Sequence, residues 1–390
     1  MKYIINFLII FVIYCFSSSS SAQSPIQVGI NNTDISILTC RSGDELYSTF
    51  GHTGVRIKND SLKTDVVFNY GLFSFNTPGF YIKFLRGQLP YKVGPFRTDE
   101  FMADYFDEKR TVLEQDLNLT DVQKNEIISF LLWNVKPENR DYPYDFFYDN
   151  CATRVEDLLS DKLKIEYTNQ IDEITFRQML KQNLQSLVWS DFGIDLVIGA
   201  RADILSDRDG QMFLPEYVFD NLKNARFIDS GDPLIGDTRV VLDFEDKNAL
   251  RKKKAINQPL IIAVLLFIIG IFINLKNLKY AQLFNSIMLW IACILGFFLL
   301  FMWFGTDHGA TKNNWNVLWL NPLLLLYFFV KGNFKKIMFY ILVAMMSVAA
   351  INVLIQFLPQ YFHSAFLPLS LLFIAILHWH YKSKIQEAIA

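Results

Sequence analysis

The segment YDFFYDNCATRVEDLL, residues 144–159, places a single cysteine at the start of a helical pattern. This pattern predicts a helix over 151–160. Asp149 or Asn150 suits the position before it, because either side chain accepts a free backbone N–H. Cys151 would then lie in the first turn, where the helix dipole and free amides favour a thiolate. Its own N–H would also be placed to stabilise an oxyanion on an attacked carbonyl.

The segment ELYSTFGHTGVRI, residues 45–57, holds the only histidine between residues 24 and 255. A thiol becomes a strong nucleophile at neutral pH when a neighbouring base takes its proton, so His52 is the expected partner of Cys151. The acceptor that would orient the imidazole is left open between Asn69 and Glu45. Arg56 shares a strand face with His52 and either binds an anionic group or forms a structural ion pair.

The region before residue 255 has the pattern of an α+β fold. Alternating apolar residues predict strands, and longer apolar periods predict helices. Thr120 and Gln123 form a capping box at the start of one helix, and Pro215 begins a further short one. The strands are expected at 35–40, 53–58, 66–73, 91–96, 112–117 and 238–244, and the helices at 98–110, 121–134, 151–160, 175–184 and 188–200.

The acidic residues are concentrated in the first two thirds of the chain. Of the 39 acids only Asp307 and Glu387 follow Ala255, whereas residues 24–250 hold 37 acids against 24 Lys and Arg. Nucleic-acid binding requires a basic face, so we expect no nucleic-acid partner.

Residues 1–22 have the features of a cleavable secretory signal peptide. A lysine, a short apolar core and a small-residue cleavage site follow one another there. The segment 23–255 would then lie outside the cytoplasm, with Cys40 and Cys151 as its two cysteines. A disulfide between them, in a non-enzymatic envelope scaffold, is therefore an alternative to a catalytic thiol.

Long apolar runs dominate the chain after Ala255 and predict a membrane domain over 256–390. Lysines gather in alternate loops, so the positive-inside rule places these loops and the C-terminus inside, and segment 23–255 outside. The five expected spans are 259–275, 281–304, 317–330, 337–357 and 364–381.

The predicted outer loop GTDHGATKNNWNVLWLNP, residues 305–322, is rich in polar side chains. Polar residues at membrane depth are costly and usually functional. We expect His308 and Asn321 either to contact a lipid substrate or to take part in docking the soluble domain onto the bundle. The tryptophans of this loop are also typical of membrane interfaces.

Together with FNYG, residues 68–71, the segments around His52 and Cys151 resemble the Lnb N-terminal periplasmic domain family, the family of the Lnb-type lipoprotein N-acyltransferases. A histidine followed by a cysteine that opens a helix is also similar to the circularly permuted papain-like (NlpC-type) thiol enzymes. The resemblance covers residues 24 to about 250. It implies a permuted papain-like α+β domain in the periplasm, followed by a multi-pass helical bundle in the bacterial inner (cytoplasmic) membrane.

The resemblance also implies a reaction. Cys151, with His52 as base, would attack an acyl ester of a phospholipid, and the thioester would pass its acyl chain to the α-amine of a diacylglyceryl-cysteine lipoprotein. In the permuted thiol enzymes the third polar residue comes from the strand after the histidine, which points to Asn69. Arg154 is assigned a substrate or support role. Tyr148, an aromatic neighbour of Cys151 in the sequence, either packs against the protein or contacts the substrate. We expect no metal ion and no cofactor.

A membrane-tethered cysteine hydrolase would use the same pair of residues with water as the acceptor. Such an enzyme would be a cell-wall peptidase or amidase, or a lipid deacylase. The surroundings of the thiol distinguish these reactions. An acyltransferase needs a water-poor groove that opens toward the bilayer, whereas a wall hydrolase needs an open cleft that faces away.

Overall fold

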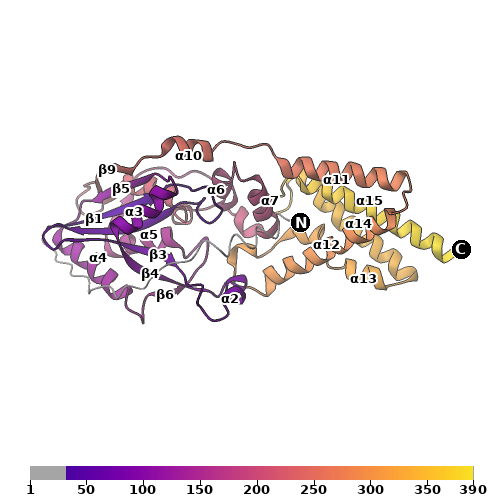
Figure 1. Cartoon of the computed structure of the whole chain (residues 1–390), viewed down its shortest axis with the longest axis horizontal. Helices are drawn as coiled ribbons and strands as arrows, with labels where there is room; N and C mark the ends of the chain where they lie inside the picture. The colour runs from indigo at the N-terminus through magenta and orange to yellow at the C-terminus, as the bar shows by residue number, and fades with distance from the viewer. Residues whose placement is uncertain (1–31, 390) are drawn as a thin grey trace.

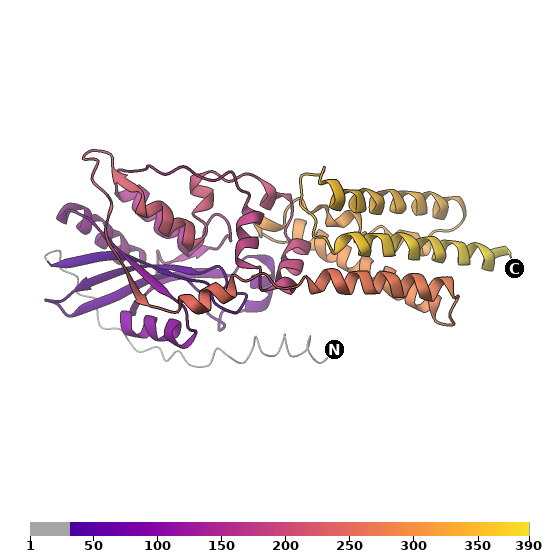
Figure 2. The same cartoon turned by 90° about the horizontal axis from the view of Figure 1, so that it is seen from above.

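The computed structural model describes residues 32–389, so the predicted signal peptide lies outside the described residues. Figures 1 and 2 show an elongated molecule, with a sheet-containing part at one end and a helical bundle at the other. The C-terminus lies at the end of the bundle remote from the sheet. An α+β domain is therefore followed by a helical membrane region.

The centre of the first part is a seven-stranded sheet with the order β6-β4-β3-β2-β1-β5-β9. Every neighbouring pair in it is antiparallel. All six predicted strands are present in this sheet. Its seventh strand, the three-residue β6, was not predicted, because it is too short to show alternation. The strands are β1 Thr33–Cys40, β2 His52–Asn59, β3 Thr64–Leu72, β4 Pro90–Arg97, β5 Val112–Leu117, β6 Asp141–Pro143 and β9 Ile235–Leu242.

The five predicted helices are also present, and the Thr120–Gln123 capping box forms as expected. They are α3 Thr98–Asp107, α4 Asp121–Asn134, α5 Cys151–Lys162, α6 Phe176–Asn183 and α7 Val188–Val197. Pro215 begins α9 Pro215–Lys223 as predicted. Elements not predicted are α2 Phe80–Arg86, β7 Ile165–Tyr167, α8 Arg208–Gln211, β8 Ala225–Phe227, α10 Glu245–Arg251 and the 3-10 turn Ala200–Asp203.

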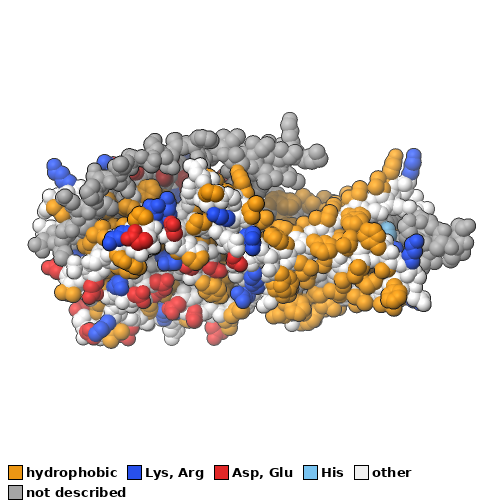
Figure 3. All heavy atoms as spheres, turned by 90° about the horizontal axis from the view of Figure 1, so that it is seen from below, with side chains coloured by type: hydrophobic (Ala, Val, Ile, Leu, Met, Phe, Trp, Pro, Cys, Tyr) orange, Lys and Arg blue, Asp and Glu red, His pale blue; other side chains and the backbone are white. Residues whose placement is uncertain are grey.

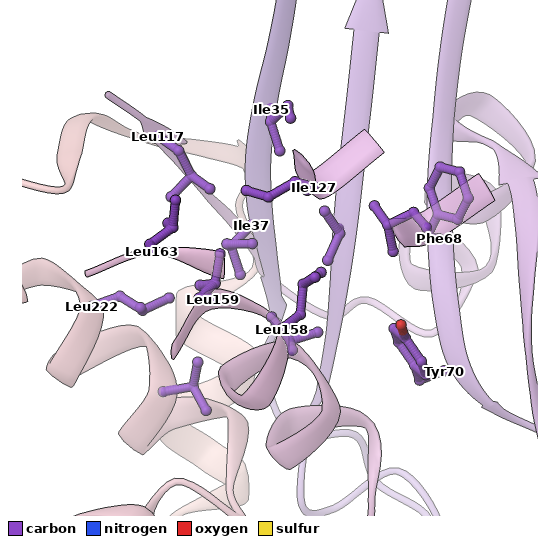
Figure 4. Packing of buried hydrophobic residues seen from close by; sticks show 14 of the residues in the cluster. Ile35, Ile37, Phe68, Tyr70, Leu117, Ile127, Leu158, Leu159, Leu163 and Leu222 are labelled. Atoms are coloured by element: carbon purple, nitrogen blue, oxygen red, sulfur yellow. The ribbon is translucent and has the colours of Figure 1, made fainter. Parts of the chain in front are cut away.

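The two faces of the sheet are covered by different helices. Because successive strand residues point to opposite faces, Ile37 joins the cluster under α4 and α5, whereas Leu38 joins the cluster under α3. Leu158 and Leu159 of α5 are buried in the larger cluster, as Figure 4 shows. A fully buried aliphatic side chain of this kind contributes roughly 1.5–3 kcal/mol to stability. This packing fixes α5, and with it Cys151, against the sheet.

Three helices of the second part are long and apolar enough to cross a membrane: α11 Gln258–Leu275, α12 Ala281–Phe304 and α14 Gly332–Ile355. Helix α15 Phe366–Ile389 is apolar over the shorter stretch Phe366–Lys382. Figure 3 shows the continuous hydrophobic surface of this bundle beside the mixed surface of the first part.

The prediction of one continuous helix over 317–330 is wrong. The segment consists of a 3-10 turn, Trp315–Leu318, and the six-residue α13, Leu324–Phe329. Pro322 lies in the break between them, where its missing N–H and its ring disfavour a continuous helix. The Asn321 side chain accepts a hydrogen bond from the backbone N–H of Leu323 at 2.9 Å and is buried in the bundle.

Carboxamide side chains join the two parts. The backbone carbonyls at the end of α7 accept hydrogen bonds of 2.8–3.2 Å from three side chains of the bundle. Asn314 donates to Leu196 and Val197, Asn316 donates to Asp195, and Gln360 donates to Ile198. Gly199 approaches the same loop so closely that a Cβ atom would lie 1.9 Å from the carbonyl oxygen of Lys312. These contacts hold the first part in a defined orientation on the bundle.

Candidate active site

Cys151 is the first residue of α5, and Asn150 rather than Asp149 is its N-cap. The Asn150 carboxamide oxygen accepts from the backbone N–H groups of Ala152 and Thr153, at 2.7 and 3.2 Å. Its nitrogen donates to the carbonyl of Phe146 and, at 2.9 Å, to that of Phe213. Asn150 therefore caps the helix and also ties the segment before Cys151 to a second loop, which fixes the thiol in place.

His52 is the first residue of β2 and lies opposite Cys40 in the register of β1. The turn before it requires glycine: Gly51 has φ +80°, and a Cβ atom would lie 2.8 Å from the Cys40 carbonyl oxygen. Nε2 of His52 is 2.6 Å from Oδ1 of Asn69 on β3. A carboxamide oxygen only accepts, so Nε2 carries the proton in this contact and Nδ1 is the nitrogen left for the thiol.

The thiol and the imidazole shift each other's pKa toward an ion pair. Burial alone would raise the pKa of Cys151, but the charge and hydrogen bond of His52, with the backbone N–H groups of Thr53 and Cys151, lower it. Burial alone would lower the pKa of His52, but the charge and hydrogen bond of Cys151 and the bond to Asn69 raise it. The arrangement favours a thiolate beside an imidazolium, which is a nucleophile prepared for attack on a carbonyl.

A bulge in β3 lies next to the thiol. The register with β4 shifts between Asn69 and Leu72, and Gly71 in this bulge has φ +88°. A Cβ atom on Gly71 would lie 3.9 Å from the Cys151 Cβ. Bulges commonly redirect side chains near active sites. Here the bulge directly follows Asn69 and leaves only backbone beside the cysteine.

Cys40 and Cys151 are both free thiols, so the disulfide alternative is not supported. Cys40 is fully buried, and burial raises its pKa to about 12.

Glu45, the other candidate for orienting the imidazole, does not take that place. It is exposed in the turn before β2, where its backbone carbonyl accepts a hydrogen bond from Ser48. Asn69 reaches His52 because β3 pairs with β2 and sets Asn69 opposite Gly54, one strand away from the histidine.

Both arginines form ion pairs within the protein, which is the structural or supporting role that the sequence left open beside a substrate role. Arg56 binds Asp65 at 2.6 Å and Glu114 at 3.0 Å, which is the structural ion pair considered above. Arg154 binds Asp149 at 2.5 Å, and its guanidinium lies 4.2 Å from the ring centroid of Tyr142.

Tyr148 and Asn321 are also not placed at the thiol. Tyr148 is exposed, and its ring contacts Phe147 and Phe176. Asn321 is buried in the bundle at the break before α13.

His308 lines a cavity of about 270 Å³ between the two parts. Tyr144, a neighbour that sequence reasoning missed, lines the same cavity. Burial, and then the charge of Cys151, raise the pKa of the Tyr144 hydroxyl, so Tyr144 lies near both the cavity and the thiol. Its place in the segment 144–159 was the only signal for it in the sequence.

One group of side chains has the spacing of a metal site within residues 32–389. It consists of Asp191, Asp195 and His363, whose ligand atoms lie within 4.8 Å of one another. The Lys181 ammonium already bonds to both carboxylates, at 2.8 and 2.6 Å, and Arg177 bonds to Asp195 at 2.7 Å. These cations neutralise the acids, so the group is a structural charge network.

Comparison with known protein families gives two matches. The Lnb N-terminal periplasmic domain matches residues 25–182, which include His52, Asn69 and Cys151. The Lnb transmembrane domain matches residues 251–387, which include α11 to α14 and most of α15. No match was found among curated proteins or among solved structures. With both domains present in this order, the chain belongs to the Lnb family, as a membrane protein with a periplasmic part.

Proposed function

We propose that this protein is a lipoprotein N-acyltransferase that carries the acyl chain as a thioester on Cys151. The observation that carries the proposal is the Cys151–His52–Asn69 arrangement, in a domain fixed to a membrane bundle of the Lnb family. The order of a histidine strand followed by a cysteine helix packed on an antiparallel sheet also supports a permuted papain-like fold.

In the first half-reaction the Cys151 thiolate attacks the acyl ester carbonyl of a phospholipid. The oxyanion that forms lies near the start of α5, where the Cys151 N–H and the helix dipole stabilise it. The ester C–O bond then breaks, and the His52 imidazolium gives its proton to the departing oxygen. The products are a lysophospholipid and the acyl thioester.

In the second half-reaction the α-amine of a diacylglyceryl-cysteine attacks the thioester carbonyl. The C–S bond breaks, the thiolate leaves, and the neutral His52 accepts the proton that the amine loses. An amide forms and the thiolate–imidazolium pair is restored. Asn69 acts as a positioning residue, because its oxygen holds Nε2–H and keeps Nδ1 directed at the sulfur.

We infer that the α+β domain lies on the outer side of the inner membrane. Lys276 and Lys279 follow α11, and Lys331 precedes α14, so these cations lie at the bundle end remote from the domain. Two long helices, the interrupted segment around α13 and two further helices would then make five passes. Fixing the domain on the bundle raises the effective concentration of two bilayer-anchored substrates.

The surroundings of the thiol favour a lipid reaction over cell-wall hydrolysis. The cavity next to Tyr144 is lined mainly by apolar side chains and lies between the domain and the bundle. This is the position expected of a water-poor site that serves the membrane.

The test is the mass of lipoprotein N-termini from cells whose only N-acyltransferase is this protein. Cys151→Ala should abolish the third acyl chain, whereas the matched Cys40→Ala change should leave it. Triacylated lipoproteins in the Cys151→Ala strain would refute the proposal. Release of free fatty acid by the purified protein, without any N-acyl product, would identify a lipid deacylase instead.

A further inference from the structure

Helix α2 and the residues before it carry large apolar side chains on the outside of the domain. Tyr81, Ile82, Phe84 and Leu85 are all exposed within the described residues, although this domain is acidic overall. Phe73 and Phe75 extend the same surface, since their rings contact Phe80 at the start of α2. We call Phe73, Phe75 and α2 the aromatic platform. An exposed apolar surface of this kind usually marks a contact with a membrane or another molecule.

The aromatic platform is held beside the outer end of a membrane helix. The backbone N–H of Asp307 donates to the Arg86 carbonyl at 2.7 Å, and Gln88 donates to the Asp307 carboxylate at 2.7 Å. His308 Nε2 lies 3.2 Å from the Phe84 carbonyl oxygen. Asp307 follows the end of α12 by three residues, and Figure 1 shows α2 next to that end. The platform therefore lies beside the end of α12 that is nearer to the α+β domain.

The charge on α2 suits a lipid surface. Lys83 and Arg86 lie in its last turn, and the helix contains no acidic residue. Apolar side chains flanked by cations are typical of helices that lie in the membrane interface, where the cations meet lipid phosphates. Continuity with the membrane bundle favours lipid over a second protein as the occupant of this surface.

A cavity opens directly behind the platform. Phe84, Leu89, Tyr91, Tyr144, Phe146 and Ala310 supply most of its apolar lining. The rings of Tyr91 and Tyr144 are stacked at 4.3 Å between centroids, and both pack on the core cluster that also contacts Cys151. The volume of about 270 Å³ is near the lower end of small-ligand pockets, which measure roughly 300–1,000 Å³. Phe84 belongs both to the platform and to the cavity wall.

We propose that the aromatic platform lies in the outer surface of the bilayer and that the cavity behind it accepts a lipid acyl chain directed toward Cys151. The membrane contact stands on its own, whereas delivery of the chain to the thiol rests on the proposed acyltransferase function. The chain would enter past Phe84, with His308 at the bundle side and Tyr144 at the inner wall.

A photoreactive amino acid tests the membrane contact in the full-length protein. Benzoylphenylalanine replaces Ile82 or, as a matched control, Ile228. Each protein is then reconstituted into liposomes of phosphatidylethanolamine and phosphatidylglycerol and irradiated. Both isoleucines are exposed, at 67% and 58%, but Ile228 lies in the segment that lines a groove with α4, remote from the bundle. We expect at least tenfold more lipid crosslinking from position 82. Equal crosslinking yields at the two positions, or no crosslinking from position 82, would refute the membrane contact of the aromatic platform.

A phospholipid with a diazirine in its acyl chain tests the cavity in the Cys151→Ala protein, which cannot turn the lipid over. We expect labelling of peptides that contain Tyr91 or Tyr144. Phe84→Ala should reduce that labelling about tenfold, and Leu85→Ala, equally exposed at 45% but outside the cavity, should change it less than threefold. If these peptides are not labelled, or if both substitutions reduce the labelling equally, the cavity does not bind the acyl chain. Labelling in a protein that proves to transfer no acyl chain would refute the proposed function alone.

Discussion

Cys40 and Cys151 are two free thiols near the same histidine, and their surroundings differ in a way that separates structure from chemistry. Cys40 ends β1, is fully buried, and has a pKa raised to about 12 by burial. Cys151 begins α5 and is partly exposed, and His52 lowers its pKa. Cys40 lies opposite His52 in the strand register, yet the imidazole forms its hydrogen bond to a thiol with Cys151 and not with Cys40. The pKa of each thiol therefore depends on its burial and on its contact with the imidazole, and proximity in the sheet is not sufficient.

The largest expected effect comes from removing the base. His52→Ala should slow thioester formation by about 10²–10⁴-fold, the usual contribution of a positioned acid–base group. The measurement is the rate at which intact-protein mass increases by one acyl chain in liposomes. Cys40→Ala is the control and should retain the wild-type rate within about twofold. A His52→Ala rate within about threefold of wild type would contradict the role of His52.

Alkylation should separate the two thiols by pH. Because His52 lowers the pKa of Cys151, its thiolate persists below the ordinary thiol pKa, and iodoacetamide should modify it at neutral pH about tenfold faster or more than Cys40. In His52→Ala the Cys151 rate profile should move to higher pH. Peptide mass spectrometry gives both rates. Equal modification of the two cysteines in the folded protein would remove the difference on which the comparison rests.

Asn69→Ala should have a smaller effect. One hydrogen bond is worth roughly 0.5–1.5 kcal/mol, so the acylation rate should fall by up to about tenfold. The bond raises the pKa of His52, so its loss should lower that pKa and move the alkaline limb of the pH–rate profile to lower pH. Asn69→Gln or Asn69→His, which keep an acceptor, are the rescue variants. An unchanged pH profile in Asn69→Ala would argue against orientation by this residue.

The smallest effect is expected for the substitution of Cys40, which should lower the stability of the protein without changing the reaction. Cys40→Ala removes a buried sulfur from the cluster with Leu38 and Val112, and should cost about 1 kcal/mol of unfolding free energy. Thermal unfolding in detergent gives this shift, with an exposed Val122→Ala change as the control. A loss of acyl transfer greater than the loss of folded protein would show that Cys40 takes part in the reaction.

Local patterns in the sequence were sufficient to predict most elements of the α+β domain. The six longer strands alternate apolar and polar residues, and the capping residues at Thr120 and Asn150 mark two helix starts through contacts three residues apart. The prediction failed where a local pattern was ambiguous. Residues 317–330 are apolar apart from Asn321, yet Pro322 and the Asn321 hydrogen bond separate a 3-10 turn from the short helix α13.

The arginines show why residue type alone did not identify substrate contacts. Arg56 resembles an anion-binding side chain until strand pairing brings Asp65 and Glu114 to it. The residues alone left Glu45 and Asn69 open and only the family resemblance favoured Asn69, whereas the β2–β3 register places the Asn69 oxygen 2.6 Å from His52. These contacts depend on neighbours far apart in the chain, which no local pattern encodes.

The sequence by itself determined which residues we propose to carry the chemistry, because the domain has one histidine and one cysteine at a helix start, in segments that identify the family. Tertiary structure decided what surrounds them. Helix α2 meets Asp307 and His308, more than 200 residues away, and only this contact creates a cavity beside Tyr144. The physical reason is that a side chain's type and capping pattern are local properties. Burial, pKa and access to the membrane arise from atoms that the fold brings together.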